Sequence, residues 1–198
     1  MVNYYAMIKE IRDYADENNV PIMQDEGINF LTTYIIKNNI HNILEIGTAI
    51  GFSAIMMCLS QPNVKVTTIE RDEKRYIEAL KNIKKFKLED KITLIYHDAL
   101  DVKIDGKFDL VFIDAAKSQN QKFFEMFSKN LNEDGSIITD NMNFHGLVFK
   151  DEGEIKSKDL RALVRKVKNY KVFLENNEDY VTRFHNVGDG VAVSVRKK

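Results

Sequence analysis

The sequence predicts an α/β fold in which a mostly parallel sheet of seven strands ends in an antiparallel hairpin. Short β-rich runs alternate with helical segments between residues 43 and 139, which is the pattern of strand-helix-strand crossovers. The run from Phe108 to Ile113 is almost continuously apolar, as expected for a strand that is covered on both faces. Near the end of the chain, Gly188-Asp189-Gly190 separates two alternating runs too closely for a crossover, so this ending predicts a hairpin.

The five parallel strands are short runs rich in β-branched and aromatic residues. They are predicted at residues 43–46, 64–69, 92–96, 108–113 and 136–139. Other segments carry apolar residues at helical spacing, and helices are predicted at residues 53–60, 72–86, 118–131 and 157–175. The two hairpin strands are predicted at residues 180–187 and 191–195.

Two more helices, at residues 3–19 and 26–39, are predicted before the sheet. The segment Val20–Met23 separates them, because Pro21 disfavours a helical conformation in the residue before it. A chain of 198 residues is long enough for one sizeable core and short for two. We therefore expect a single domain over residues 1–198, with the N-terminal helices in residues 3–39.

The composition indicates a soluble protein. The first ten residues lack a basic stretch followed by an apolar run, and the chain contains no apolar run long enough to span a membrane. We therefore expect a cytoplasmic protein with no membrane partner. Cys58 is the single cysteine, which excludes a disulfide within the chain, and its apolar surroundings predict a buried structural thiol.

The charged residues are unevenly distributed, although the formal net charge is only −1. One basic cluster, interrupted only by Glu78, consists of Lys74, Arg75, Lys81, Lys84, Lys85 and Lys87. A denser cluster, interrupted only by Asp159, consists of Lys156, Lys158, Arg161, Arg165, Lys166, Lys168 and Lys171. Each cluster fits either the solvated face of an amphipathic helix or a surface that contacts a polyanion.

A tight glycine turn, in the segment ILEIGTAIGFSA, follows the first predicted strand. Glu45 ends the strand, Gly47 and Gly51 lie in the turn, and Ser53 begins the next helix. The middle glycine of the dinucleotide pattern G-x-G-x-x-G is absent, and an acidic residue would repel a pyrophosphate. The carboxylate instead suits a ligand with an ammonium group, such as the methionine part of S-adenosylmethionine. A purely structural turn remains the alternative.

The next two strands end in further candidate ligand-binding residues. Glu70, in TTIERD, is placed to accept hydrogen bonds from ribose hydroxyls. Asp98 and Ala99, in IYHDALD, could meet an adenine edge through a carboxylate and a backbone N–H. His97 is expected to be a partly buried residue at the strand end.

Polar residues also follow the fourth and fifth strands. Asp114 and Lys117 occur in FIDAAK, and Asp140 and Asn141 occur in ITDN. Because consecutive parallel strands are usually neighbours, these side chains are expected to converge at one edge of the sheet. Two carboxylates and a carboxamide oxygen form a hard oxygen site suited to Mg²⁺ or another divalent cation. Helix capping could explain either aspartate separately, but it does not explain the whole set.

Several motifs together resemble one family: LEIGTAIGFSA, TTIERD, FIDAAK, ITDN and VGDGVAVSV. They are similar to the cation-dependent O-methyltransferases of the catechol and caffeoyl-CoA type, which have a Rossmann-like class I methyltransferase fold. Within that family the segments PIMQDEG and FIDAAKSQNQKFFEM most resemble the bacterial branch that methylates 5-hydroxyuridine at the tRNA wobble position. The resemblance also implies a homodimer.

The resemblance implies roles for individual residues. It implies metal ligation by Asp114, Asp140 and Asn141, and a catalytic role for Lys117 together with Asp114. Contacts with S-adenosylmethionine are implied for Ile22, Met23, Glu45, Gly47, Ser53, Glu70, Asp98, Ala99 and Asp114. His97 stands where the family often has glycine, so the adenine contacts are the weakest part of the assignment.

Three functions remain open at the level of the sequence. The first is methylation of 5-hydroxyuridine in a tRNA anticodon loop, which the basic cluster at residues 156–171 favours. The second is methylation of a small catechol-like molecule, because a catechol also presents two neighbouring oxygens to a cation. The third is a non-catalytic nucleotide- or RNA-binding module, which has no need for a Mg²⁺ site beside a candidate base.

Overall fold

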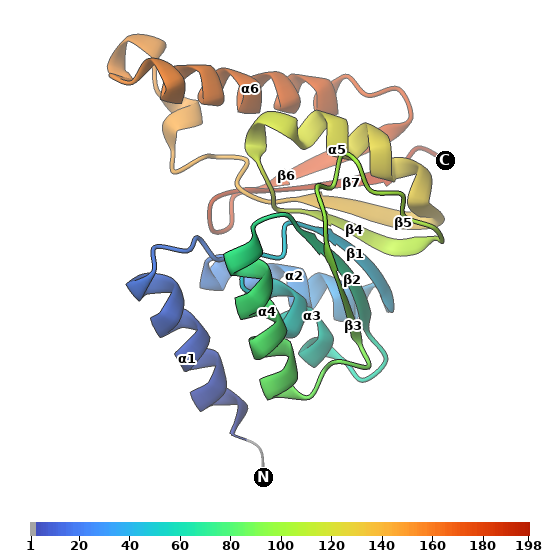
Figure 1. The fold of residues 1–198 in the computed structure, drawn as a ribbon. Helices are drawn as coiled ribbons and strands as arrows, with labels where there is room; N and C mark the ends of the chain where they lie inside the picture. The colour runs from blue at the N-terminus through green and yellow to red at the C-terminus, as the bar shows by residue number, and fades with distance from the viewer. Residues whose placement is uncertain (1–2) are drawn as a thin grey trace.

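The computed structural model describes residues 3–198 and contains one seven-stranded sheet in the order β3-β2-β1-β4-β5-β7-β6 (Figure 1). The strands are β1 (Asn42–Ile46), β2 (Lys65–Glu70), β3 (Ile92–Tyr96), β4 (Phe108–Ile113), β5 (Leu131–Thr139), β6 (Tyr180–His185) and β7 (Val191–Arg196). The pairings among β1 to β5 are parallel, whereas β7 is antiparallel to both β5 and β6. The predicted α/β fold with its terminal hairpin is confirmed.

Helices cover both faces of the sheet. They are α1 (Tyr4–Glu17), α2 (Asp25–Lys37), α3 (Phe52–Ser60), α4 (Glu73–Phe86), α5 (Asn120–Phe127) and α6 (Lys158–Glu175). In Figure 1, α1 to α4 lie on one side of the sheet and α5 and α6 lie on the other. The pattern along β4 explains this arrangement, because Leu110 and Phe112 pack into one core cluster and Val111 and Ile113 pack into the other.

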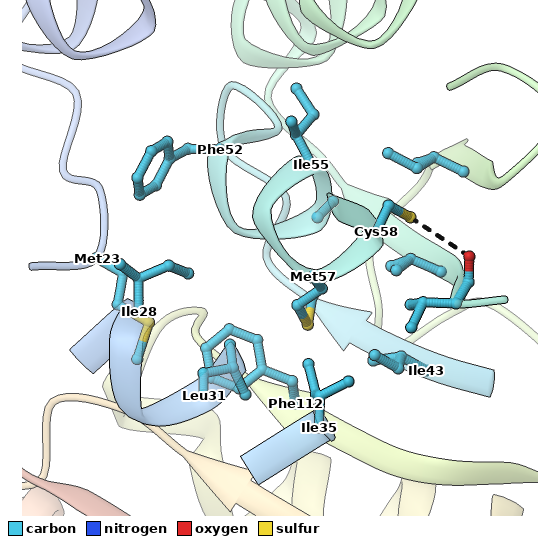
Figure 2. Packing of buried hydrophobic residues seen from close by; sticks show 14 of the residues in the cluster. Met23, Ile28, Leu31, Ile35, Ile43, Phe52, Ile55, Met57, Cys58 and Phe112 are labelled. Carbon is cyan, nitrogen blue, oxygen red and sulfur yellow. Dashed lines mark hydrogen bonds between the residues drawn. The ribbon is translucent and has the colours of Figure 1, made fainter. Parts of the chain in front are cut away.

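The larger of the two clusters joins α1, α2 and α3 to the sheet. Figure 2 shows Leu31 and Ile35 of α2 close to Met57 of α3 and to Phe112 of β4. Cys58 is buried here as expected, and its thiol lies 3.8 Å from the carbonyl oxygen of Val64. Burial raises the pKa of this thiol to about 12, so Cys58 is a structural residue.

The predicted end of one helix and the predicted start of the strand that follows it, at residue 136, are both wrong. A helix was expected over residues 118–131, but α5 ends at Phe127 and a 3₁₀ turn leads into β5 at Leu131. The polar residues after Leu131 hide the start of the strand in the sequence. The register between β4 and β5 shifts between Phe108 and Leu110, and this bulge accommodates the extra residues of β5.

No helix within residues 3–198 combines the length and the apolar character that crossing a bilayer requires.

Candidate active site

The site lies at the carboxyl ends of four neighbouring parallel strands, which end in register. Ile69, Ile46, Ile113 and Thr139 lie side by side in the register of β2, β1, β4 and β5. The residue after each is therefore found at the same edge of the sheet, as follows: Glu70, Gly47, Asp114 and Asp140. Backbone hydrogen bonds continue across this edge, since the Asp114 N–H donates to the Ile46 carbonyl (2.9 Å) and the Asp140 N–H to that of Ile113 (3.1 Å).

A cavity of about 290 Å³ opens at this edge. Its walls contain ten residues that the sequence predicted for the site: Ile22, Met23, Gly47, Glu70, Asp98, Ala99, Asp114, Lys117, Asp140 and Asn141. The segment before α2 forms one wall, and the turns after the strands form the others. The carboxyl ends of the strands thus bring together residues that lie more than a hundred positions apart in the chain.

Gly47 is required by the geometry of the glycine turn. Its φ is +101°, and a Cβ atom at this position would lie 2.2 Å from the carbonyl oxygen of Asp114. No residue with a side chain fits there without moving one of the two strand ends. Gly51, with φ +86°, occupies the position before α3.

Glu45 and Ser53 lie behind the cavity wall rather than in it. The carboxylate of Glu45 is fully buried and accepts hydrogen bonds from the hydroxyls of Ser53 and Thr68. Burial raises the pKa of Glu45 to about 7, because the charged form loses its hydration. These hydrogen bonds join Glu45 of β1 to α3 and β2, and a direct contact between Glu45 or Ser53 and a cofactor stays a prediction.

Glu70 connects two turns. One carboxylate oxygen accepts a hydrogen bond from the N–H of Ala49 in the glycine turn (2.8 Å), and the other accepts from those of Arg71 and Asp72. These bonds fix the side chain at the cavity wall, where the sequence predicted a ribose contact.

The third strand end carries Asp98 and its neighbours. The pKa of Asp98 is lowered, first by a hydrogen bond from the N–H of Leu100 and then by the guanidinium of Arg71. This carboxylate therefore stays ionised at the wall of the cavity. His97 was expected to be partly buried, but its side chain is exposed and also lines the cavity. The expectation failed because β3 is the edge strand of the sheet.

Two neighbouring carboxylates lie at the opposite end of the cavity: Asp140 is buried, and the side chain of Asp114 is 21% exposed. Burial raises the pKa of Asp114, and burial together with the neighbouring Asp114 raises that of Asp140 to about 7. The ammonium group of Lys117 lies 4.0 Å from a carboxylate oxygen of Asp114 and opposes its shift. Two neighbouring acids that resist ionisation fit a divalent cation, since a cation offsets the cost of ionising both.

Asn141 completes the oxygen donors at this end. Its φ of 60° is uncommon for a residue with a side chain and directs the chain out of β5 into the following loop. Within residues 3–198, no group of three or more His, Cys, Asp or Glu side chains could hold a metal ion. A cation here would therefore depend on two carboxylates and the Asn141 amide, and a site of the zinc type is not present among the described residues.

The sequence analysis did not assign several residues of the cavity wall to the site, among them Arg71, Arg75 and His145, and it also missed Asp189, which contacts His145. The Asp189 carboxylate is buried in the hairpin turn and accepts a hydrogen bond from the backbone N–H of His145 (2.5 Å) and a long one from the Asn141 amide (3.4 Å). The His145 imidazole lines the cavity, with Nδ1 3.6 Å from Asp189. The turn motif predicted the hairpin but gave no sign that its aspartate contacts another loop.

Comparison with known proteins supplies the deciding observation. The sequence matches the O-methyltransferase family over residues 2–197, which is nearly its full length. The chain belongs to this family. It is similar to the caffeoyl-CoA O-methyltransferase of Populus kitakamiensis, with 27% identity over 97% of this chain and 87% of the relative.

Solved structures agree with this membership. A Staphylococcus aureus protein, provisionally assigned as a caffeoyl-CoA O-methyltransferase, is 38% identical, with a TM-score of 0.90 over 96% of this chain and 92% of that one. An O-methyltransferase from Bacillus cereus, solved with S-adenosylhomocysteine, is 26% identical, with a TM-score of 0.82 over 97% and 91% of the two chains. This methyltransferase is accordingly a class I enzyme of the caffeoyl-CoA type that depends on S-adenosylmethionine.

The cavity of the O-methyltransferase has two chemically different ends. Glu70, Asp98 and Ala99 lie at the end predicted to hold the nucleoside of the cofactor. Asp114, Asp140 and Asn141 lie at the end predicted to hold a cation and the methyl acceptor. Lys117 also lines the cavity, and its side chain is 22% exposed, so a bound acceptor can reach its ammonium group.

Proposed function

We propose that this O-methyltransferase holds a divalent cation at Asp114, Asp140 and Asn141 and methylates one of two neighbouring oxygens of its acceptor. The observation that carries the proposal is the pair of carboxylates at the adjacent ends of β4 and β5, both of which line the cavity and have a raised pKa. S-adenosylmethionine supplies the methyl group. A cation at this position would orient the two acceptor oxygens and favour loss of the hydroxyl proton.

Lys117 is the residue that we assign to proton removal. Its Nζ atom lies at the cation end of the cavity, 4.0 Å from a carboxylate oxygen of Asp114. Among the described residues, Lys117 forms no closer ion pair with a carboxylate. The side chain can therefore turn toward an acceptor hydroxyl and accept its proton when it is neutral. Once Lys117 has taken the proton, the Asp114 carboxylate stabilises the resulting ammonium group.

A catechol-type small molecule is the acceptor class that the comparisons favour. The Populus relative is named for caffeoyl-CoA, and a flavonoid methyltransferase of Vitis vinifera is 28% identical over 94% of this chain. A catechol presents two adjacent hydroxyls, which matches a site that binds two oxygens at one cation.

A tRNA acceptor is the second candidate, and the surface charge favours it. A 5-hydroxyuridine presents its hydroxyl beside a carbonyl oxygen, so it offers the same pair of donors as a catechol. Residues 150–168, from the loop before α6 into the helix, hold seven basic and four acidic side chains, a net charge of +3 in a chain whose total is −1. A wobble base lies in a single-stranded loop, and its entry into the cavity avoids the cost of opening a duplex.

Separate assays with the two classes of acceptor test both parts of the proposal. The purified enzyme receives Mg²⁺ and methyl-labelled S-adenosylmethionine with either a panel of catechols or tRNA that carries 5-hydroxyuridine. We expect transfer that stops in excess EDTA and returns when Mg²⁺ is restored. Transfer to catechols alone rejects the tRNA acceptor, transfer to tRNA alone rejects the small-molecule acceptor, and full activity in EDTA rejects the cation site.

A further inference from the structure

His145 lies in a turn whose backbone is uncommon for residues with side chains. The φ angles of Phe144 and His145 are 45° and 54°, and that of Gly146 is 76°. A left-handed conformation costs free energy in any residue other than glycine, so two in succession must be held in place by the surrounding structure. The turn buries the Phe144 ring in a small cluster beneath α6 and places the His145 imidazole at the wall of the cavity.

The carboxylate of Asp189 holds His145 at two points. One oxygen accepts a hydrogen bond from the backbone N–H of His145 (2.5 Å), and the other lies 3.6 Å from Nδ1 of the imidazole. The side chain of Asp189 is 4% exposed, whereas that of His145 is 69% exposed. A carboxylate attracts an N–H group and repels a nitrogen lone pair, so the uncharged imidazole carries its hydrogen on Nδ1. Its lone pair is therefore on Nε2, the ring nitrogen that does not face Asp189.

The same aspartate connects His145 to the acceptor end of the cavity. Its second oxygen also accepts a long hydrogen bond from the Asn141 amide (3.4 Å), and the N–H of Phe144 donates to the Asn141 carbonyl (3.3 Å). The imidazole and the predicted ligand Asn141 thus belong to one hydrogen-bonded unit at one end of the cavity. The proposed function assigns the carboxylates and the ammonium group of this end to the cation and to proton removal, and it leaves His145 without a role.

We propose that His145 selects the acceptor by accepting a hydrogen bond at Nε2 from a hydroxyl that neighbours the methylated one. The inference rests on the proposed function, in which two neighbouring acceptor oxygens lie at the cation end. A hydroxyl can donate this bond, whereas a carbonyl or ether oxygen cannot. An acceptor without the second hydroxyl leaves a polar group of the site unpaired, and such sites discriminate strongly. His145 therefore favours a catechol over 5-hydroxyuridine, whose neighbouring oxygen is a carbonyl.

Kinetics with two acceptors test the selection. His145→Ala should lower kcat/KM for catechol by about 10- to 100-fold, mainly through a higher KM, because the variant loses the hydrogen bond to the second hydroxyl. The kcat/KM for the free nucleoside 5-hydroxyuridine should change by less than about threefold, so the preference for catechol should fall. His185→Ala is the matched control and should keep both wild-type values, since His185 lies in β6 and its ring packs against Phe30 of α2 (ring centroids 4.8 Å apart).

Nitrogen NMR of the four histidines provides a second test that does not require turnover. The spectrum of His145→Ala identifies the signals of His145 in the wild type. We expect the Nδ1–H form of this ring in the free protein. Adding catechol with Mg²⁺ and S-adenosylhomocysteine should move the Nε2 signal of His145 and leave that of His185 in place. A ring that carries a hydrogen on Nε2, alone or on both nitrogens, cannot accept this bond and would overturn the inference.

The outcomes separate this inference from the proposed function. If catechol is methylated in a Mg²⁺-dependent manner but His145→Ala changes kcat/KM by the same factor on both acceptors, or not at all, the selection by His145 is wrong and the proposed function stands. If catechol moves the Nε2 signal but no Mg²⁺-dependent transfer follows, the contact stands and the proposed function fails. Efficient transfer by the wild type to 5-hydroxyuridine but not to catechol overturns the selection alone. The absence of both the signal change and the transfer overturns both.

Discussion

The buried carboxylate of Glu45 makes the stability of the protein depend on pH. Its pKa is about 7 in the folded chain, because burial disfavours the charged form, and near 4.5 when the chain is unfolded. Between these two values the folded protein keeps a proton that the unfolded chain has lost. The free energy of unfolding therefore falls as pH rises from 4.5 to 7, and the full loss persists above pH 7.

Replacing this carboxylate tests the argument. Glu45→Gln cannot ionise, so its stability relative to the wild type should improve by up to about 3 kcal/mol as pH rises from 4.5 to 7. Denaturant unfolding of the cofactor-free proteins at several pH values measures this difference. Asp140 titrates in the same window in both proteins and cancels from the comparison. Parallel pH profiles would show that Glu45 ionises freely in the fold.

Asp140 provides a second prediction at the scale of one residue. Asp140→Asn removes one of two carboxylates that repel each other, so the variant without metal should be as stable as the wild type or more stable. It should also lose the stabilisation that Mg²⁺ gives the wild type. Thermal unfolding with and without Mg²⁺ measures both effects. Asp134→Asn, whose side chain is 89% exposed in the same strand, should keep the wild-type response.

At the scale of elements, the hairpin turn and the loop after β5 form one unit. The backbone N–H groups of Met142 and Asn143 donate to the carbonyls of Gly190 and Asp189 (2.9 and 2.8 Å). The hairpin turn also contacts α2, because the Gly188 N–H donates a hydrogen bond to the Glu26 carboxylate (3.1 Å). The predicted ligand Asn141 thus depends on a hairpin that lies almost fifty residues later in the chain.

This dependence predicts an effect of Asp189 on cation binding. Asp189→Asn weakens the hydrogen bonds that position Asn141 and His145, and the affinity for Mg²⁺ should fall by roughly 10- to 100-fold. The dependence of the melting temperature on Mg²⁺ concentration measures it. Affinity for S-adenosylmethionine, followed by calorimetry, should change little. Asp179→Asn, an exposed residue beside β6, is the control. Unchanged Mg²⁺ affinity in a folded Asp189→Asn protein would remove Asp189 from this role.

The sequence predicts the strands and their polar ends well, because the relevant signals are local. Asp114 and Asp140 could be placed together before the structure was known, since consecutive parallel strands end at one edge. The contact between Asp189 and His145 could not, because it joins residues 44 positions apart through a loop whose path no periodicity encodes. The exposure of Phe149 is equally invisible, since an apolar residue among apolar neighbours predicts burial.

At the scale of the whole molecule, the cofactor should stabilise the fold. S-adenosylmethionine at about 100 times its dissociation constant should add about 2.7 kcal/mol, which corresponds to a rise of roughly 5–10 °C in the melting temperature. Thermal unfolding with the cofactor measures this rise, and NAD at the same concentration should give none. An equal response to NAD would contradict the interpretation of the glycine turn.

The strand order also divides the cavity between two parts of the chain. β1 and β4 are neighbours at the point where the crossovers change direction, with β2 and β3 on one side and β5 to β7 on the other. The walls predicted for the methyl donor come mainly from residues before 100, and those predicted for the acceptor come from residues after 113. Acceptor preference can therefore diverge between relatives, or be exchanged by grafting the segment from β5 to α6, while the donor half of the chain stays as it is.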